Sequence, residues 1–86
     1  MVDKNKIFDG LVKYLIGESI LDLKISDITL ETDIREDMGF DSLQLNTMIL
    51  DLEDQYNIEF NDEVSQLKTV GEVVELIVEK VGFWFR

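Results

Sequence analysis

The chain contains no cysteine, no histidine and no proline. Without cysteine there can be no disulfide framework, no thiolate metal site and no thiol nucleophile. Without histidine, the usual zinc and iron ligand sets and the usual general base are also missing. The sequence therefore predicts neither a metal site nor catalysis by the chain's own residues, and we expect a protein that is not an enzyme.

Positive charge is also scarce. Eight lysine and arginine residues stand against 19 aspartate and glutamate residues, so the formal net charge is −11. Such a surface repels the phosphates of nucleic acids and of anionic membranes, and it attracts proteins with basic patches. Acidity alone can also serve only to keep a small domain soluble. The charge therefore predicts basic protein partners and no nucleic acid.

Long apolar runs are absent, and the first residues, MVDKNKIFDG, show neither a signal peptide nor a membrane span. We expect no membrane insertion, a cytoplasmic location and a monomer. Hydrophobic residues still make up 45% of the 86 residues, which is typical of a folded chain. The sequence therefore predicts one small domain over residues 1–86, with a modest core.

Three segments have the apolar spacing of amphipathic helices. The first helix is predicted from about residue 3 to about 18, and the second from about 42 to 56. The third opens with a capping box formed by Thr69 and Glu72, and Gly82 is placed to end it in a left-handed cap. Their apolar faces contain Ile7, Phe8, Leu11, Val12, Leu15 and Ile16; Leu45, Met48, Ile49, Leu52 and Tyr56; and Val70, Val73, Val74, Ile77 and Val81.

Two connections complete the predicted bundle. The segment NDEVSQL, with Asn61 as its N-cap, predicts one short helix before the third long one. Residues 19–40 form a long first loop, which we expect to lie on the core and to let the first two helices run closer to parallel than a tight hairpin would. The loop residues predicted to enter the core are Ile25, Ile28, Leu30, Ile34, Met38 and Phe40. The predicted fold is an all-α, four-helix bundle with three main helices, one short helix and a long first loop.

The stretch DMGFDSLQLN places a serine at the start of the second helix. Asp41 is a preferred N-cap residue, so Ser42 is predicted at the first helical position, where unpaired N–H groups favour an anion such as a phosphate ester. Gly39 permits the turn before the helix, and Leu43 is predicted to face inward and anchor it. A lone Asp-Ser pair is usually only a helix cap, so this motif needs support from the rest of the chain.

That support comes from the wider pattern. The stretch DMGFDSLQLNTMILDLEDQYNIEFNDEV, followed by LKTVGEVVELI, resembles the acyl carrier protein family over roughly residues 3 to 82. The resemblance implies that a phosphopantetheinyl transferase esterifies Ser42 with 4′-phosphopantetheine from coenzyme A, with Asp41 and Leu43 flanking the attachment site. It further implies a carrier that holds acyl groups as thioesters and presents them to the enzymes of fatty acid, polyketide or related biosynthesis.

The resemblance also implies that partners with basic docking patches bind the second helix. The residues expected to meet the acyl-loading and acyl-processing enzymes there are Asp41, Gln44, Thr47, Asp51, Glu53 and Asp54. Gln44 and Thr47 are neutral where carriers of housekeeping fatty acid synthesis usually have carboxylates. This difference leaves two readings open, a carrier of one specialised pathway and an ordinary carrier with harmless substitutions.

Other functions remain as alternatives. One is an aminoacyl or peptidyl carrier of a specialised pathway, and another is an acidic helical interaction module whose serine is only a cap. A calcium-binding loop in LETDIREDMGFD lacks the spacing of acids that an EF-hand requires. At the end of the chain, Phe83, Trp84 and Phe85 can pack on the bundle or contact an enzyme, and the gain from aromatic burial favours packing.

Overall fold

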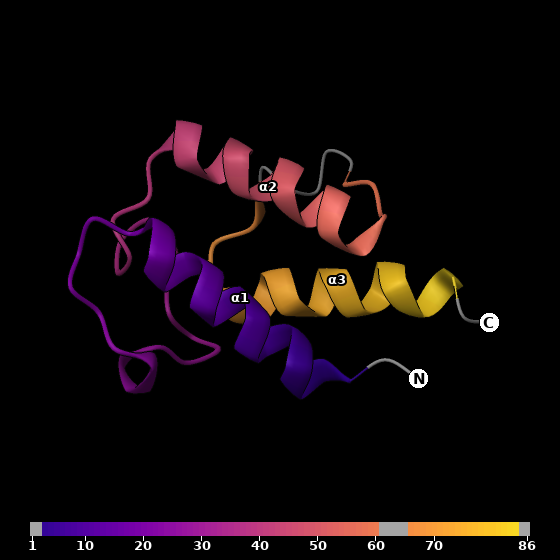
Figure 1. The fold of residues 1–86 in the computed structure, drawn as a ribbon, viewed down its shortest axis with the longest axis horizontal. Coiled ribbons are helices and arrows are strands. Elements are labelled where there is room, and N and C mark those ends of the chain that lie inside the picture. Colours follow the sequence, from indigo (N-terminus) through magenta and orange to yellow (C-terminus); the bar gives the residue numbers. More distant parts are fainter. Residues whose placement is uncertain (1–2, 61–65, 85–86) are drawn as a thin grey trace.

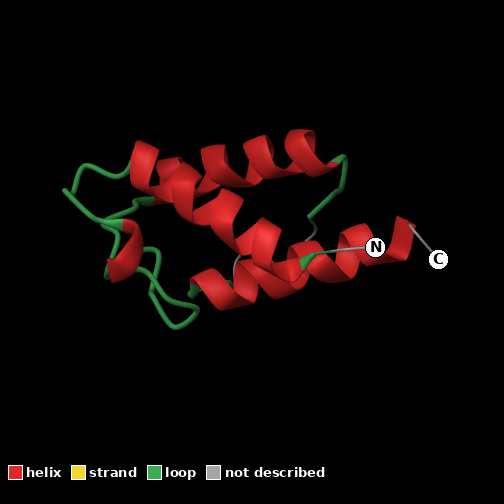
Figure 2. Ribbon diagram, turned by 60° about the horizontal axis from the view of Figure 1, so that its bottom comes forward, coloured by secondary structure: helices red, strands yellow, loops and turns green. Residues whose placement is uncertain are grey.

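The computed structural model describes residues 3–60 and 66–84 and shows three long helices. They are α1 (Lys4–Glu18), α2 (Ser42–Tyr56) and α3 (Val70–Trp84), and the first connection contains a short 3-10 helix, η1 (Ile25–Asp27). No strand occurs in these two ranges, so the prediction of an all-α fold with a long first loop is confirmed (Figure 2). Most of the short helix predicted over NDEVSQL, residues 61–67, falls in residues 61–65, which lie outside the described residues. None of the described helices is long and apolar enough to cross a membrane.

The core lies between the three helices and the first connection. Its side chains come from every predicted apolar face, because residues three and four positions apart share one side of a helix. The buried residues are Ile7, Leu11, Val12 and Leu15 of α1; Ile28, Ile34, Met38 and Phe40 of the connection; Met48 and Leu52 of α2; Ile58; and Val70, Val73, Val74 and Ile77 of α3. The connection thus supplies core residues in place of a fourth long helix.

The first connection packs against the start of α3. The amide of Ile34 donates to the carbonyl of Lys68 at 2.9 Å, and the amide of Gly71 donates to the carbonyl of Leu30 at 2.8 Å. A Cβ atom on Gly71 would lie only 2.8 Å from that carbonyl oxygen, so the contact requires glycine. The prediction that Leu30 and Ile25 enter the core is wrong, since both side chains are exposed and Leu30 holds the fold through its backbone.

The direction of α1 relative to α2 also differs from the prediction. The two helices run in opposite directions (Figure 1), because the long connection turns back and returns to the end of α1. The side chain of Gln44 reaches the carbonyl of Glu18, and Tyr14 reaches Asp51. Earlier residues of α1 therefore face later residues of α2. Loop length does not by itself set helix direction, so the expectation that these two helices run closer to parallel than in a tight hairpin is wrong.

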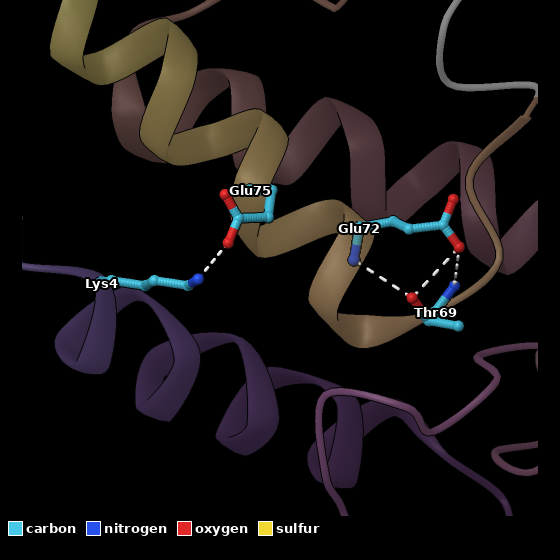
Figure 3. A network of polar contacts seen from close by, with 4 residues as sticks. All are labelled: Lys4, Thr69, Glu72 and Glu75. Carbon is cyan, nitrogen blue, oxygen red and sulfur yellow. Dashed lines mark hydrogen bonds and ion pairs between the residues drawn. The ribbon is translucent and has the colours of Figure 1, made fainter.

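The start of α3 is built as predicted, but its end is not. Thr69 and Glu72 form a reciprocal capping box: the amide of Glu72 donates to the Thr69 hydroxyl at 3.1 Å, and the amide of Thr69 donates to the Glu72 carboxylate at 3.2 Å (Figure 3). Gly82 does not end the helix, which continues to Trp84. Of the described glycines only Gly39 has a positive φ, so Gly82 keeps a helical backbone. The side chains of Phe83, Trp84 and Phe85 lie outside the description.

Candidate functional site

The turn that precedes α2 depends on glycine and on the end of α1. Gly39 has a φ of 74°, a conformation that other residues adopt only at a cost, and this confirms the predicted turn. The Ser19 hydroxyl donates to the carbonyl of Met38 at 2.9 Å. A Cβ atom on Gly39 would lie 3.4 Å from the side chain of Leu21. The residues that follow α1 therefore pack directly behind the turn.

The first turn of α2 is capped from both sides. The amide of Gln44 donates to the Asp41 carboxylate at 2.8 Å, and the Gln44 side-chain oxygen accepts from the amide of Asp41 at 3.2 Å. This confirms Asp41 as the N-cap and Ser42 as the first helical residue. Because the cap holds the first turn in helical form, the position of Ser42 is well defined.

Ser42 is exposed and its hydroxyl makes no hydrogen bond to another described residue. The amides of the first helical residues have no partner within the helix, so they create a partial positive charge beside this hydroxyl. The chain has no histidine or cysteine to act as a base. The arrangement therefore suits a hydroxyl that another enzyme modifies, and not one that attacks a substrate unaided.

Leu43, the next residue, does not anchor the helix. Its side chain is 74% exposed, so the prediction that it faces inward is wrong. The buried positions of α2, Met48 and Leu52, lie on another side of the helix. Leu50 is seven residues after Leu43, on the same side of the helix, and is 65% exposed. Two leucines therefore face solvent along α2.

A cavity of about 260 Å³ opens beside Ser42. Its lining is mostly apolar and comes from α2, from the first connection, from the connection before α3 and from α3 itself. The lining residues are Ile34, Arg35, Ser42, Leu45, Asn46, Met48, Ile49, Leu67 and Val73. The sequence did not single out Arg35, Asn46 or Leu67 as site residues, because only the fold brings them to one place.

Most of the residues predicted to meet partners already have partners within the chain. Thr47 donates its hydroxyl to the carbonyl of Leu43 at 3.0 Å, and the Glu53 carboxylate accepts from the amide of Phe60 at 2.8 Å. The side chain of Gln44 bonds to Asp41 and also to the carbonyl of Glu18, at 3.1 Å. The recognition role of these residues stays a prediction, but their side chains also hold the fold.

Of the two aspartates predicted to meet partners in the second half of α2, Asp51 has a partner within the chain and Asp54 has none among the described residues. The Tyr14 hydroxyl donates to the Asp51 carboxylate at 2.6 Å. Burial raises the pKa of Tyr14 far above its ordinary value, and the hydrogen bond to Asp51 raises this pKa further. Asp54 is exposed and has no hydrogen bond or ion pair to another described residue. Of the predicted acids on α2, Asp54 is thus the most available to a partner.

The acids before the turn serve the backbone. The Asp33 carboxylate accepts from the amides of Arg35 and Glu36, at 2.9 and 2.8 Å. The Asp37 carboxylate accepts from the amide of Asp33 at 2.8 Å. Within the described ranges, no three acidic side chains gather in a way that would hold a metal ion. These carboxylates therefore stabilise the turns that lead to Ser42.

Comparison with known proteins places this geometry in a family. Residues 16–77 match the family described as "Phosphopantetheine attachment site". An acyl carrier protein from Thermotoga maritima is 32% identical over 83 residues, which cover 95% of this chain and 100% of that protein. One from an Exiguobacterium species is 43% identical over 58 residues, covering 66% of this chain and 73% of that protein.

The fold comparison agrees. The solved structure of the acyl carrier protein from Enterococcus faecalis superposes with a TM-score of 0.78 at 25% sequence identity, covering 92% of this chain and 99% of that one. The family match extends over the turn, all of α2 and the capping box of α3, which are the elements that define the site. The chain therefore belongs to the acyl carrier protein family, and it is a carrier with a covalently attached 4′-phosphopantetheine group, not an enzyme.

Proposed function

We propose that Ser42 is the residue that carries the 4′-phosphopantetheine group. The observation that supports this assignment most directly is the exposed hydroxyl at the start of α2, which has no competing partner among the described residues. A phosphate on this oxygen would lie beside the free amides of the first turn, where a helix terminus stabilises an anion by about 0.3–1 kcal/mol. The residues around Ser42 therefore fit the group.

The bound group supplies a flexible arm ending in a thiol, to which an acyl chain is joined as a thioester. This chain contributes no thiol of its own, because it has no cysteine. Its own residues hold the attachment point: Asp41 caps the helix, and Gly39 allows the turn. Tethering keeps the acyl group at a high local concentration for successive enzymes without any new contact.

We also propose that the cavity beside Ser42 shelters the hydrocarbon part of the cargo. Leu45, Met48, Ile49 and Val73 give it an apolar lining, which favours an alkyl chain over a polar aminoacyl group. This supports an acyl carrier over the alternative of an aminoacyl or peptidyl carrier. Fatty acid, polyketide or related biosynthesis all use such cargo.

For the partner surface, we propose the outward stripe of α2, defined as Leu43, Thr47, Leu50 and Asp54. These residues recur at steps of three and four and are all exposed. A transferase or an acyl-processing enzyme that fits this stripe would present an apolar hollow for the two leucines and a basic residue for Asp54. Exposed apolar residues next to a modification site are a common basis of recognition.

We further propose that the protein is a monomer in the cytoplasm, where coenzyme A and the biosynthetic enzymes are available. The lack of cysteine places no demand on an oxidising compartment.

The attachment site is tested by incubating the chain with coenzyme A and a broad-specificity phosphopantetheinyl transferase and measuring the intact mass. Ser42→Ala removes the acceptor, and Ser26→Ala is the matched control, since Ser26 is an exposed serine in η1. We expect the wild type and Ser26→Ala each to gain one phosphopantetheine and Ser42→Ala to gain none. A gain by Ser42→Ala would place the group on another residue.

A further inference from the structure

The end of α1 and the start of α2 are joined behind Ser42. As described above, Ser19 holds the carbonyl of Met38, and Leu21 packs against Gly39. The third contact is longer in sequence: the side-chain nitrogen of Gln44 donates to the carbonyl of Glu18 at 3.1 Å, across 26 residues. This bond connects the helix that bears Ser42 to a different helix of the bundle.

Gln44 is suited to this contact because both atoms of its amide are used. Its oxygen accepts from the amide of Asp41 at 3.2 Å, and its nitrogen donates to the Glu18 carbonyl. The first group is an N–H at a helix start and the second is a C=O at a helix end, and neither has a partner within its own helix. A carboxylate at position 44 could accept from Asp41 but could not donate to Glu18.

The bond also lies on one particular side of α2. Along the side facing α1, Gln44 bonds to Glu18 at the start of the helix, and Asp51 bonds to Tyr14 two turns later. On the side facing α3, the helix borders the cavity beside Ser42, whose lining includes Val73. Polar bonds therefore fasten α2 to α1, while the space between α2 and α3 is left partly open.

We infer that Gln44 is a positioning residue, whose amide fastens the start of α2 to α1 and so fixes how Ser42 is presented to the transferase. The inference rests on the proposed function, since it assigns a role in the modification of Ser42. A widening of the cavity between α2 and α3 would leave this bond unbroken. The bond would therefore hold Ser42 in one position if the space beside it widened.

Substitutions at position 44 can distinguish the effect of the bond to Glu18 from the effect of the cap formed with Asp41. Gln44→Glu keeps an oxygen that can accept from the amide of Asp41, removes the donor to Glu18 and adds a negative charge. Gln44→Met has a similar length and removes both bonds. Gln55→Glu is the control, because it introduces the same negative charge at an exposed position near the far end of α2. Each variant is compared with the wild type by amide hydrogen exchange and by the kinetics of phosphopantetheine transfer.

We expect Gln44→Glu to speed exchange at the amides of Gln44 and Leu45 by roughly three- to tenfold, with no change in the last turn of α2. The kcat of transfer should fall by a similar factor while KM stays near the wild-type value, because the outward stripe of α2 is untouched. Gln44→Met should show a larger increase in the exchange rate and a larger fall in kcat than Gln44→Glu. Gln55→Glu should match the wild type in both.

Three results would overturn the inference. Unchanged exchange in Gln44→Glu would show that the bond does not hold the start of α2. Slower transfer with unchanged exchange would make Gln44 a direct contact of the transferase. Faster exchange with normal kcat would show that transfer does not depend on the bond. If the wild type itself accepts no phosphopantetheine, the proposed function fails, whereas the exchange measurements still decide whether the bond holds α2.

Discussion

The starts of α2 and α3 each have a capping box, but the remaining backbone N–H groups at the two helix starts are treated differently. Asp41 and Gln44 cap one helix, and Thr69 and Glu72 cap the other. At α3, the amides of Val70 and Gly71 then donate to carbonyls of the first connection, so that helix start is covered. At α2, Ser42 is exposed and its hydroxyl has no partner among the described residues.

This difference separates a structural helix start from a functional one. Free N–H groups at a helix start are a cost unless water, a side chain or a ligand satisfies them. The fold satisfies them at α3 with its own backbone, and at α2 it leaves them beside a serine that can receive a phosphate. The two capping side chains differ too. Glu72 bonds to Thr69, whereas Gln44 bonds to Asp41 and also to Glu18 of α1.

The largest effect on stability is expected at the start of α3, where Gly71 packs closely against the first connection. Gly71→Ala would place a Cβ atom 2.8 Å from the Leu30 carbonyl oxygen, so either the first connection or α3 must shift. We expect a loss of about 2–3 kcal/mol in the free energy of unfolding, measured with urea. Gly17→Ala, which has nothing within 4 Å, is the control and should be neutral or slightly stabilising. Equal losses in both variants would contradict the close contact.

The two caps should be equal in stability and unequal in function. Thr69→Ala and Asp41→Ala each remove an N-cap and should each cost about 1 kcal/mol in urea unfolding. Only Asp41→Ala should also slow phosphopantetheine transfer, because it loosens the turn that bears Ser42. Transfer that is slowed equally by Thr69→Ala would show that the rate follows global stability and not the order of the α2 start.

The bond between Tyr14 and Asp51 predicts a response to alkaline pH. The pKa of Tyr14 is raised in the folded chain, so the protonated form is favoured there. Its contribution to stability is complete below the unfolded pKa of about 10 and is lost as pH rises above it. Burial also raises the pKa of Tyr56, so this residue likewise makes the fold less stable at alkaline pH. Tyr14→Phe should cost about 0.5–1.5 kcal/mol at neutral pH and reduce the loss of stability above pH 10. An unchanged alkaline slope in Tyr14→Phe would contradict this account.

The smallest effect on stability is expected on the outward stripe of α2. Leu43→Ser and Leu50→Ser alter side chains that are 74% and 65% exposed, so each should change the free energy of unfolding by less than about 0.5 kcal/mol. Both should raise the KM of the transferase or of an acyl-processing partner by several-fold, since a docking leucine is lost. Leu52→Ser, at a buried position of the same helix, should instead destabilise the fold strongly. A normal KM for both exposed variants would remove the stripe from the proposal.

Much of this architecture follows from local patterns in the sequence. The spacing of apolar residues predicts the three helices, and the side chains of Asp41 and Thr69 mark two helix starts within a residue of where they occur. These features are predictable because they depend on residues at most four positions apart. The position of Ser42 at the start of α2 was predictable for the same reason.

The remaining features depend on contacts between distant segments. The role of Gln44 toward Glu18 requires α1 and α2 to be antiparallel, and the length of residues 19–40 does not determine that. Leu43 was expected to be buried because it is apolar, but its position on the helix turns it outward. Gly82 was expected to end α3, although a glycine stops a helix only when its backbone turns left-handed. A cavity formed from several separate segments leaves no local pattern in the sequence.

The most direct test of the account is to locate the phosphopantetheine by fragmenting the modified chain in a mass spectrometer. The chain offers other hydroxyl groups for comparison, including Ser19 at the end of α1 and Thr47 one turn into α2. The account predicts that every fragment carrying the group contains Ser42 and that fragments lacking this residue are unmodified. A phosphopantetheine on any other residue, or none after treatment with an active transferase, would contradict it.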